Sequence, residues 1–129
     1  MRKYFAAALI AIASLGASLA GQAQVGQDIP NMGVAPKVEN GIGRADVRVF
    51  DEAGRPIPNA SVKLESKRSD GYFCETDWGL TNPDGVMVLP PLHMGQVTLR
   101  VKANGFKSQN LHITRDSLGS PIRVTLLHK

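Results

Sequence analysis

The sequence has 129 residues, with 15 lysines and arginines against 11 aspartates and glutamates, a formal net charge of +4. Two of the basic residues, Arg2 and Lys3, precede an uncharged apolar run, so loss of that run as a leader leaves 13 basic and 11 acidic residues, a balance of +2. So small a charge, with both signs interleaved, gives no support for nucleic acid as a partner, because nucleic-acid binding requires a clustered basic face. The single cysteine, Cys74, excludes an internal disulfide bond.

The N-terminus has the pattern of a secretory signal peptide. Met1-Arg2-Lys3 is followed by "YFAAALIAIASLGASLA", which carries no charge, and small residues allow cleavage after Ala20 or after Ala23. No later segment is apolar for long enough to stop transfer, so we expect no membrane span. The signal peptide therefore occupies residues 1–23, and its short alanine-rich core favours a bacterial host and a secreted or periplasmic protein.

Residues 24–43 are rich in Gly, Gln, Pro and Asn and have no sustained hydrophobic period. This composition predicts an extended, flexible arm ahead of the domain. The run Asn31-Met32-Gly33-Val34 could dock on the domain, but nothing in the sequence requires it. The remaining residues, 44–129, are enough for one domain that folds without a disulfide bond.

From residue 44 onward, apolar and polar residues alternate in short runs. This two-residue period is typical of half-buried strands, and turn-forming Asp, Asn, Gly and Pro stand between the runs. No segment has a helical period over ten residues. About seven short strands at regular spacing predict an all-β fold, a seven-stranded antiparallel β-sandwich of the transthyretin type. The apolar members of the clearest runs are Val47 and Val49, Val62 and Leu64, Val97, Leu99 and Val101, Leu111 and Ile113, and Ile122, Val124 and Leu126.

The segment from Tyr72 to Trp78 divides into two sets by parity. One set is Tyr72, Cys74, Thr76 and Trp78, and the other, mostly charged, is Phe73, Glu75 and Asp77. We therefore expect the first set to face the core, with Cys74 an inert packed residue. Phe73 is then an aromatic side chain on the solvent face, beside two carboxylates.

Three segments carry a pattern of turn and core residues: "VRVFDEAGRPIPNASVKLES", "GLTNPDGVMVLPPLHMGQVTLRVKANGFKS" and "IRVTLLHK". The pattern resembles the carboxypeptidase regulatory-like domain, a transthyretin-like sandwich often grouped with the carbohydrate-binding-like fold, over about residues 44 to 127. The matching residues belong to turns and core rather than to reacting groups, so the resemblance implies a fold and no particular activity. They are Asp51, Gly54, Pro56, Ile57, Ala60, Val62, Leu64, Thr81, Asp84, Gly85, Leu92, Gly95, Leu99, Val101 and Gly105.

One departure from the family pattern lies in the turn before Ala60. Asn59 stands where glycine is usual. Asparagine is tolerable there, because it adopts a positive φ more readily than other non-glycine residues.

Two enzyme classes built on related sandwiches are excluded by missing residues. The transthyretin-related hydrolases carry a histidine, an arginine and a Y-R-G-S tail, where this chain has Arg48, Val86 and "LLHK". Intradiol dioxygenases need paired tyrosine and histidine iron ligands, and the mature chain has one tyrosine. The sequence supports no Ser-His-Asp or Cys-His arrangement and has no glycine-rich phosphate loop. We therefore expect a non-enzyme that needs no cofactor.

Copper is the first metal to consider, because His93, His112, His128 and two methionines, Met87 and Met94, are soft or borderline ligands. The spacing argues against such a site. His93 and Met94 are neighbours and point apart, and the other histidines lie on different strands. We expect exposed histidines and methionines that fill the core.

Calcium is the second metal to consider, because Asp77, Asn82 and Asp84 offer oxygen ligands close together. The run Asn82-Pro83-Asp84-Gly85 is also a turn, in which Pro and Gly set φ and Asp84 bonds its own backbone. The turn interpretation is preferred, so no metal site is predicted.

Two binding functions remain. The favoured one is a non-catalytic exported module of the cell envelope that engages a protein partner through a sheet face, an open edge or the arm. The alternative is a carbohydrate-binding module that recognises cell-wall or extracellular glycan on exposed aromatic rings, with Phe73 and Trp78 as the candidate ligand-binding residues. A buried Trp78 is preferred, because sandwiches commonly bury a strand tryptophan, and an exposed Trp78 would favour glycan. The oligomeric state is left open.

Overall fold

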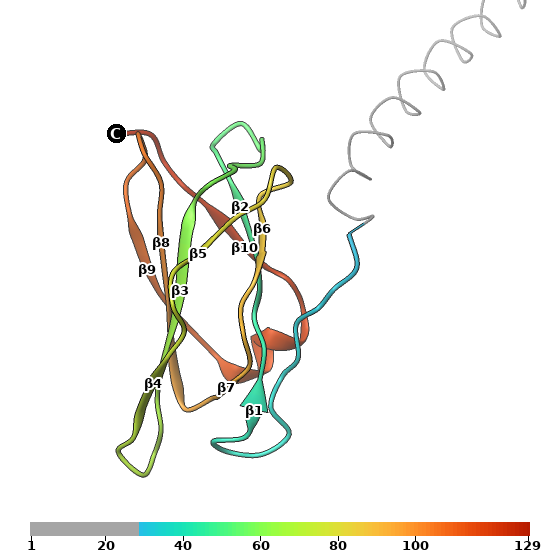
Figure 1. Cartoon of the computed structure of the whole chain (residues 1–129), viewed down its shortest axis with the longest axis vertical. Helices are drawn as coiled ribbons and strands as arrows, with labels where there is room; N and C mark the ends of the chain where they lie inside the picture. Colours follow the sequence, from blue (N-terminus) through green and yellow to red (C-terminus); the bar gives the residue numbers. More distant parts are fainter. Residues whose placement is uncertain (1–28) are drawn as a thin grey trace, which may run out of the picture. The chain divides into compact units, whose positions relative to one another are not determined.

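The computed structural model describes residues 29–129, of which Asn31–Lys129 form one unit (Figure 1). The predicted signal peptide, residues 1–23, and residues 24–28 of the predicted arm lie outside the described residues. The elements are β1 (Ile42–Gly43), β2 (Asp46–Phe50), β3 (Ser61–Lys67), β4 (Phe73–Glu75), β5 (Gly79–Leu80), β6 (Val86–Val88), β7 (Leu92–His93), β8 (Gln96–Lys102), β9 (Gln109–Ile113), the 3-10 helix η1 (Arg115–Gly119) and β10 (Ile122–Thr125).

Two main sheets face each other, as the alternating pattern predicts. Strands β4, β3, β8 and β9 lie in that order, with β5 also paired to β3, and all of these pairs are antiparallel. The second sheet has the order β10, β2, β6, in which β10 and β2 run parallel (Figure 1). The seven longer strands account for the predicted number, while β1, β5 and β7 are two-residue pairings. The prediction of an all-β sandwich is confirmed.

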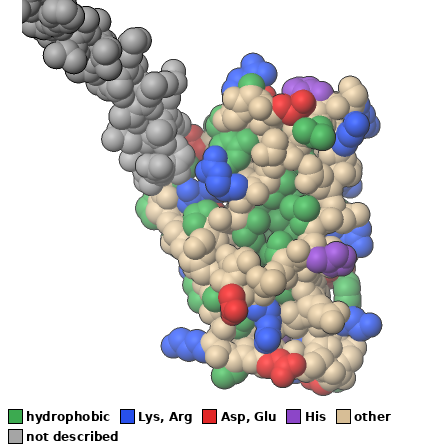
Figure 2. Space-filling view, turned by 180° about the vertical axis from the view of Figure 1, so that it is seen from behind, with side chains coloured by type: hydrophobic (Ala, Val, Ile, Leu, Met, Phe, Trp, Pro, Cys, Tyr) green, Lys and Arg blue, Asp and Glu red, His purple; other side chains and the backbone are tan. Residues whose placement is uncertain are grey.

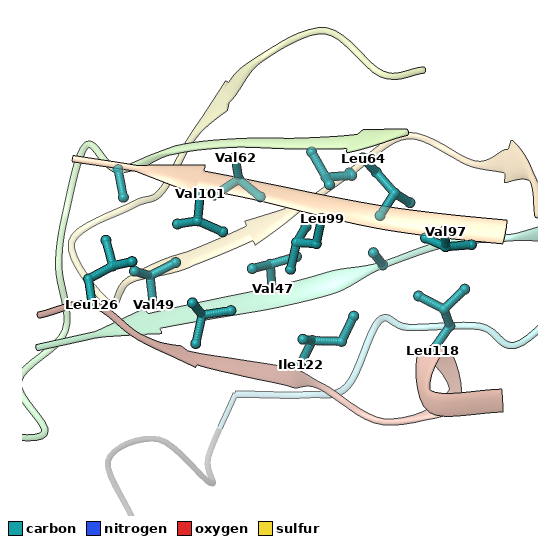
Figure 3. Packing of buried hydrophobic residues seen from close by; sticks show 14 of the residues in the cluster. Val47, Val49, Val62, Leu64, Val97, Leu99, Val101, Leu118, Ile122 and Leu126 are labelled. Atoms are coloured by element: carbon teal, nitrogen blue, oxygen red, sulfur yellow. The ribbon is translucent and has the colours of Figure 1, made fainter. Parts of the chain in front are cut away.

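The core lies between the two sheets and is built from alternate residues of both (Figure 3). Val47 of β2, Leu64 of β3 and Leu99 of β8 are completely buried. Burial of an aliphatic side chain of this size contributes about 1.5–3 kcal/mol each. Met94 is also fully buried and Met87 is partly buried against the core, as expected for methionines that fill space.

Partly buried apolar side chains close the core at its margins, among them Leu111 and Ile113 of β9. On the side seen in Figure 2, apolar side chains reach the surface in the middle of the domain, and charged side chains are scattered singly around them. Phe106, another margin residue, stacks on His128 with ring centroids 4.3 Å apart. The C-terminal segment is thereby fixed to the turn before β9.

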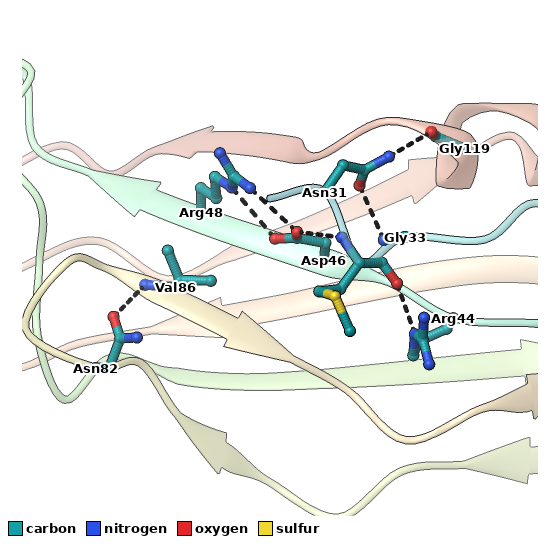
Figure 4. A network of polar contacts seen from close by, with 9 residues as sticks. Asn31, Gly33, Arg44, Asp46, Arg48, Asn82, Val86 and Gly119 are labelled. Carbon is teal, nitrogen blue, oxygen red and sulfur yellow. Dashed lines mark hydrogen bonds and ion pairs between the residues drawn. The ribbon is translucent and has the colours of Figure 1, made fainter. Parts of the chain in front are cut away.

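The segment from Asn31 to Arg44 is bound to the domain, which corrects the predicted arm over residues 31–43 (Figure 4). Val34 and Arg44 exchange two backbone hydrogen bonds of 2.9 Å, and β1 pairs with β7. The Asn31 amide donates to the carbonyl of Gly119 at 2.8 Å, and the backbone N–H of Met32 donates to Asp46 Oδ2 at 3.0 Å. Composition gave no sign of this docking, because its partners lie far along the chain.

Both turns singled out in the sequence are present, but in one of them the side chain that accepts the backbone N–H groups is not the predicted one. Asn59 has φ +59°, as expected for an asparagine in the place of glycine. In the Asn82–Gly85 turn, Asn82 Oδ1 accepts the backbone N–H groups of Asp84 at 2.9 Å and Val86 at 3.0 Å. The capping side chain is therefore Asn82 and not Asp84, because the amide oxygen at the first turn position reaches the N–H groups two and four residues on.

Candidate binding face

The outer surface of the five-stranded sheet, here called the open face, is a regular grid of polar side chains. Strand register sets its rows. Glu75, Glu65, Thr98 and His112 lie side by side in one row, and Lys63, Arg100 and Asn110 in the next. The rows beyond these are Phe73, Lys67 and Gln96 at one end, and Leu80, Ser61 and Lys102 at the other.

Ion pairs connect the strands across the middle of the open face. Lys63 Nζ lies 2.9 Å from Glu75 Oε2 and 4.0 Å from Glu65 Oε2. Arg100 Nε lies 2.9 Å from Glu65 Oε1, and Arg100 also donates to Asn110 Oδ1 at 3.3 Å. Partly exposed ion pairs of this kind contribute modestly to stability, and they hold the long side chains along the sheet.

Phe73 lies on the open face opposite Lys67 and is 58% exposed, as predicted. A shallow hollow beside its ring is lined by Glu65, Lys67, Gln96, Thr98 and His112. An exposed phenylalanine next to hydrogen-bonding groups is a place where an amphipathic ligand can pack its apolar side.

Trp78 was expected in the core, and this expectation is wrong: its side chain is 42% exposed. The register explains the error. In β4, Glu75 pairs with Glu65 and Cys74 with Ser66, but in β5, Gly79 pairs with Val62 and Leu80 with Ser61. The edge strand therefore contains one residue more than β3 between these two pairings, a bulge that reverses the side-chain alternation.

The bulge places Trp78 on the open face, where the ammonium groups of two lysines lie over its indole ring. Lys102 Nζ is 4.4 Å and Lys63 Nζ is 5.6 Å from the centroid of the indole ring. Gly79 takes the inward position next to Trp78, where a Cβ would collide with Met87 Cε. This glycine is the one sign of the bulge in the sequence, because a glycine inside a strand often marks such a site.

The rest of the predicted inward set is mixed. Thr76 is buried, accepting the backbone N–H of Leu64 at 3.0 Å through Oγ1. Cys74 is a free, half-buried thiol instead of a fully packed one. Tyr72 is 69% exposed, because it lies beyond the last pair of the β3–β4 hairpin, Lys67 with Phe73, and stacks near Arg68.

The three histidines are exposed and each has a different neighbour. His93 Nδ1 lies 2.8 Å from the carbonyl of Asn40, and His112 Nδ1 lies 3.2 Å from Thr98 Oγ1. Glu52 Oε1 accepts the backbone N–H of His128 and contacts its ring Nδ1, both at 2.8 Å. The backbone N–H is the larger cause of a lowered pKa for Glu52. Within residues 29–129, no three His, Cys, Asp or Glu side chains come together in a metal-ligand group.

Comparison with known families decides the class of the domain. Residues 46–126 match the carboxypeptidase regulatory-like domain. The chain belongs to this family. Domains of this family are of a regulatory, non-catalytic type and have a transthyretin-like sandwich fold. The comparison with curated proteins found no match.

The residues that carry the family pattern are structural in this carboxypeptidase regulatory-like domain. Asp51 Oδ1 accepts the backbone N–H groups of Ala53 and Arg55, each at 2.9 Å, and so closes the turn after β2. Thr81 Oγ1 accepts the N–H of Ala60 at 2.9 Å and donates to the carbonyl of Ile57 at 2.6 Å. The described residues contain no helix long and apolar enough to cross a membrane.

Proposed function

We propose that this protein is a non-catalytic binding module, exported to the periplasm or cell exterior, that binds glycan through the open face. The observation that carries the proposal is the exposure of both Phe73 and Trp78 on the same face of one sheet. Sugar rings present C–H groups that pack on aromatic rings, while their hydroxyl groups take hydrogen bonds from neighbouring polar side chains. The open face offers both kinds of group.

The leader sequence supports the proposed location, because a chain with residues 1–23 removed meets its ligand outside the cytoplasm. The regulatory, non-catalytic character of the family supports binding without catalysis. Cell-wall or extracellular glycan is the carbohydrate that such a protein encounters.

The test is binding of the purified mature protein to a set of cell-wall and extracellular polysaccharides. Trp78 is the only tryptophan in the chain, so its fluorescence reports directly on the open face. We expect red-shifted emission that acrylamide quenches readily and that a bound glycan protects. Loss of an aromatic stacking contact worth about 1 kcal/mol should weaken binding roughly fivefold in Trp78→Ala and in Phe73→Ala, measured by co-sedimentation with the polysaccharide, which needs no tryptophan signal.

Tyr72→Ala is the matched control, because Tyr72 is an even more exposed aromatic residue that lies outside the grid of the open face. Its affinity should remain that of the parent protein. If no polysaccharide binds, or if all three variants behave alike, glycan binding at the open face is rejected.

A protein partner is the second candidate, favoured by a separate observation. The edge strands β4 and β5 and the hairpin before them expose Tyr72 and Leu80, 69% and 59% respectively, beside a strand edge that a partner strand could extend. Residues 31–43 of the predicted arm give this candidate no support, because they are bound to their own domain.

Photo-crosslinking in the native cell envelope tests this candidate. A crosslinking residue at position 80 should capture one protein, and the same residue at position 107, away from this edge, should not. A partner captured only from position 80, together with failure to bind glycan, would replace the first proposal by the second.

A further inference from the structure

The Trp78 end of the open face differs from its Phe73 end in charge. Two adjoining hollows meet there and share Lys102 and Ser108. The first is also lined by Trp78, Arg100 and Asn110. No Asp or Glu side chain lines either hollow, whereas Glu65 lines the hollow beside Phe73.

The second hollow extends this surface to the end of the sheet. Its polar lining includes Asn59, Ser61, Asn104 and Lys129. Apart from the charged Lys129, these side chains offer neutral hydrogen-bond donors and acceptors, which suit sugar hydroxyl groups. Hydroxyl and amide groups therefore lie next to the positively charged Lys102, which lines both hollows.

Lys102 is the cation that lies closest to Trp78, and Lys129 is a second lysine on the lining of the other hollow. Arg100 is paired with Glu65, and Lys63 with Glu75. Within the described residues, Lys102 pairs with no carboxylate; its ammonium group lies over the indole ring of Trp78 instead.

Two acidic side chains lie near this end of the face, and neither forms an ion pair with Lys102. Asp77, next to Trp78 in the chain, is exposed and lines neither hollow. Glu52 is engaged by the backbone N–H and ring of His128.

The surface is unsuited to an acidic peptide strand. Lys102 and Arg100 belong to β8, which pairs with β3 on one side and β9 on the other. The backbone of β8 therefore has no free edge to which a peptide could add. A flat ring bearing a carboxylate meets the geometry better, because one face can pack on Trp78 while the carboxylate reaches the ammonium group beside it.

Building on the proposed glycan-binding function, we infer that the Trp78 end of the open face selects an acidic glycan, with the carboxylate of a uronic acid residue bound by Lys102 and, secondarily, Arg100. The apolar C–H face of that sugar packs on Trp78. Ser108 and Asn110 bind its hydroxyl groups. A charge-assisted contact at an exposed site is worth a few-fold in affinity, so the selection for acid over neutral glycan is about fivefold.

The experiment titrates the mature protein, through Trp78 fluorescence, with three soluble probes: polygalacturonate, its methyl-esterified form and polyglutamate. We expect polygalacturonate to bind about fivefold more tightly than the neutral ester, with the difference reduced by added salt. Lys102→Gln should reduce that difference to about twofold or less, mainly by weakening the binding of polygalacturonate, because Arg100 is the only other cation assigned to the carboxylate. Lys67→Gln, which removes an exposed lysine from the Phe73 end of the same face, should preserve the difference.

Each other outcome has a definite meaning. Equal binding of the acid and the ester overturns the acidic selection and leaves glycan binding intact. Failure of both polysaccharides, and of the wider polysaccharide set, removes the proposed function itself. Binding of polyglutamate as tightly as polygalacturonate shows attraction of any polyanion and overturns the assignment to a sugar.

Discussion

On the outer face of β2, Asp46 and Arg48 form an ion pair at 3.2 Å, and their side chains are 1% and 5% exposed. On the outer face of the other sheet, Glu65 and Arg100 form a pair at 2.9 Å, and their side chains are 16% and 41% exposed. Strands β2, β3 and β8, which carry these residues, all alternate apolar and polar residues in the sequence. The ion pair on β2 is nevertheless buried, whereas the pair on the other sheet is partly exposed to solvent.

The difference arises from what lies over each sheet. The segment 31–34 crosses the outer face of β2, where the backbone N–H of Met32 donates to Asp46 Oδ2 (Figure 4). Further along β2, the guanidinium group of Arg123 lies 4.2 Å from the centroid of the Phe50 ring. The described residues place no such segment over the open face. Alternation therefore indicates which residues point away from the core, and the course of the rest of the chain determines which of them meet solvent.

The largest expected effect comes from breaking each ion pair in turn. Asp46→Asn removes the carboxylate from a buried guanidinium group and should lower the free energy of unfolding by about 3 to 5 kcal/mol. Glu65→Gln removes the equivalent charge from the open face and should cost about 1 kcal/mol or less. Urea denaturation of both variants measures the difference. Equal losses would mean that the outer face of β2 is not covered in solution.

The cover itself is tested at Gly33. A Cβ on Gly33 would collide with the carbonyl oxygen of Leu118, so Gly33→Ala should lift segment 31–34 and cost about 1 to 3 kcal/mol. Gly119→Ala is the control, because its Cβ would lie 3.7 Å from Ala35 Cβ, an ordinary contact. Amide hydrogen exchange at Met32 should speed up in the first variant only. An unchanged rate would show that the segment does not depend on this close approach.

A smaller effect is expected at the turn that leads into β3, the strand that contributes to both the core and the open face. Asn59 has φ +59°, so Asn59→Ala should cost about 1 kcal/mol, whereas Asn59→Gly should be close to neutral. Thermal unfolding of the pair isolates the backbone term, because both variants lose the same amide group. If glycine were as costly as alanine, the side chain of Asn59 and not its φ would matter.

The smallest expected effect is a loss of stability at acidic pH through Asp51. The backbone N–H of Arg55 lowers the pKa of Asp51 below its ordinary 3.8, with its side chain adding to the shift. A lowered folded-state pKa gives stability that is present above the unfolded value and is lost as pH falls below about 3.8 toward the folded value.

Asp51→Asn tests this, because the amide oxygen can still accept the turn N–H groups but cannot titrate. Its urea midpoint should fall less steeply below pH 3.8 than that of the parent chain. Parallel pH profiles for the two proteins would contradict the role of Asp51 in acid sensitivity.

The fold was accessible from the sequence because its evidence is local. Val62 and Leu64, or Leu99 and Val101, repeat every second residue, and the turns between strands carry the Asp, Asn and Gly that turns require. Phe73 was assigned correctly for the same reason, since it lies within three regular pairs of β4 with β3. The positive φ of Asn59 also followed from local turn chemistry.

Trp78 and residues 31–43 of the predicted arm were assigned wrongly because their evidence is not local. One extra residue between Glu75 and Gly79 reverses the alternation, and only the pairing of β5 with β3 reveals it. Asn31 and Met32 bind Gly119 and Asp46, 88 and 14 residues away, contacts that no composition predicts.

By itself, then, the sequence determined the family, the sandwich and the inward sides of its regular strands, because period and turn chemistry act between near neighbours. The tertiary structure alone decided which outward residues are covered and where the alternation slips. Both outcomes depend on which distant segments meet. Segment 31–34 covers the ion pair of Asp46 and Arg48, and the pairing of β5 with β3 turns Trp78 toward solvent beside Lys102.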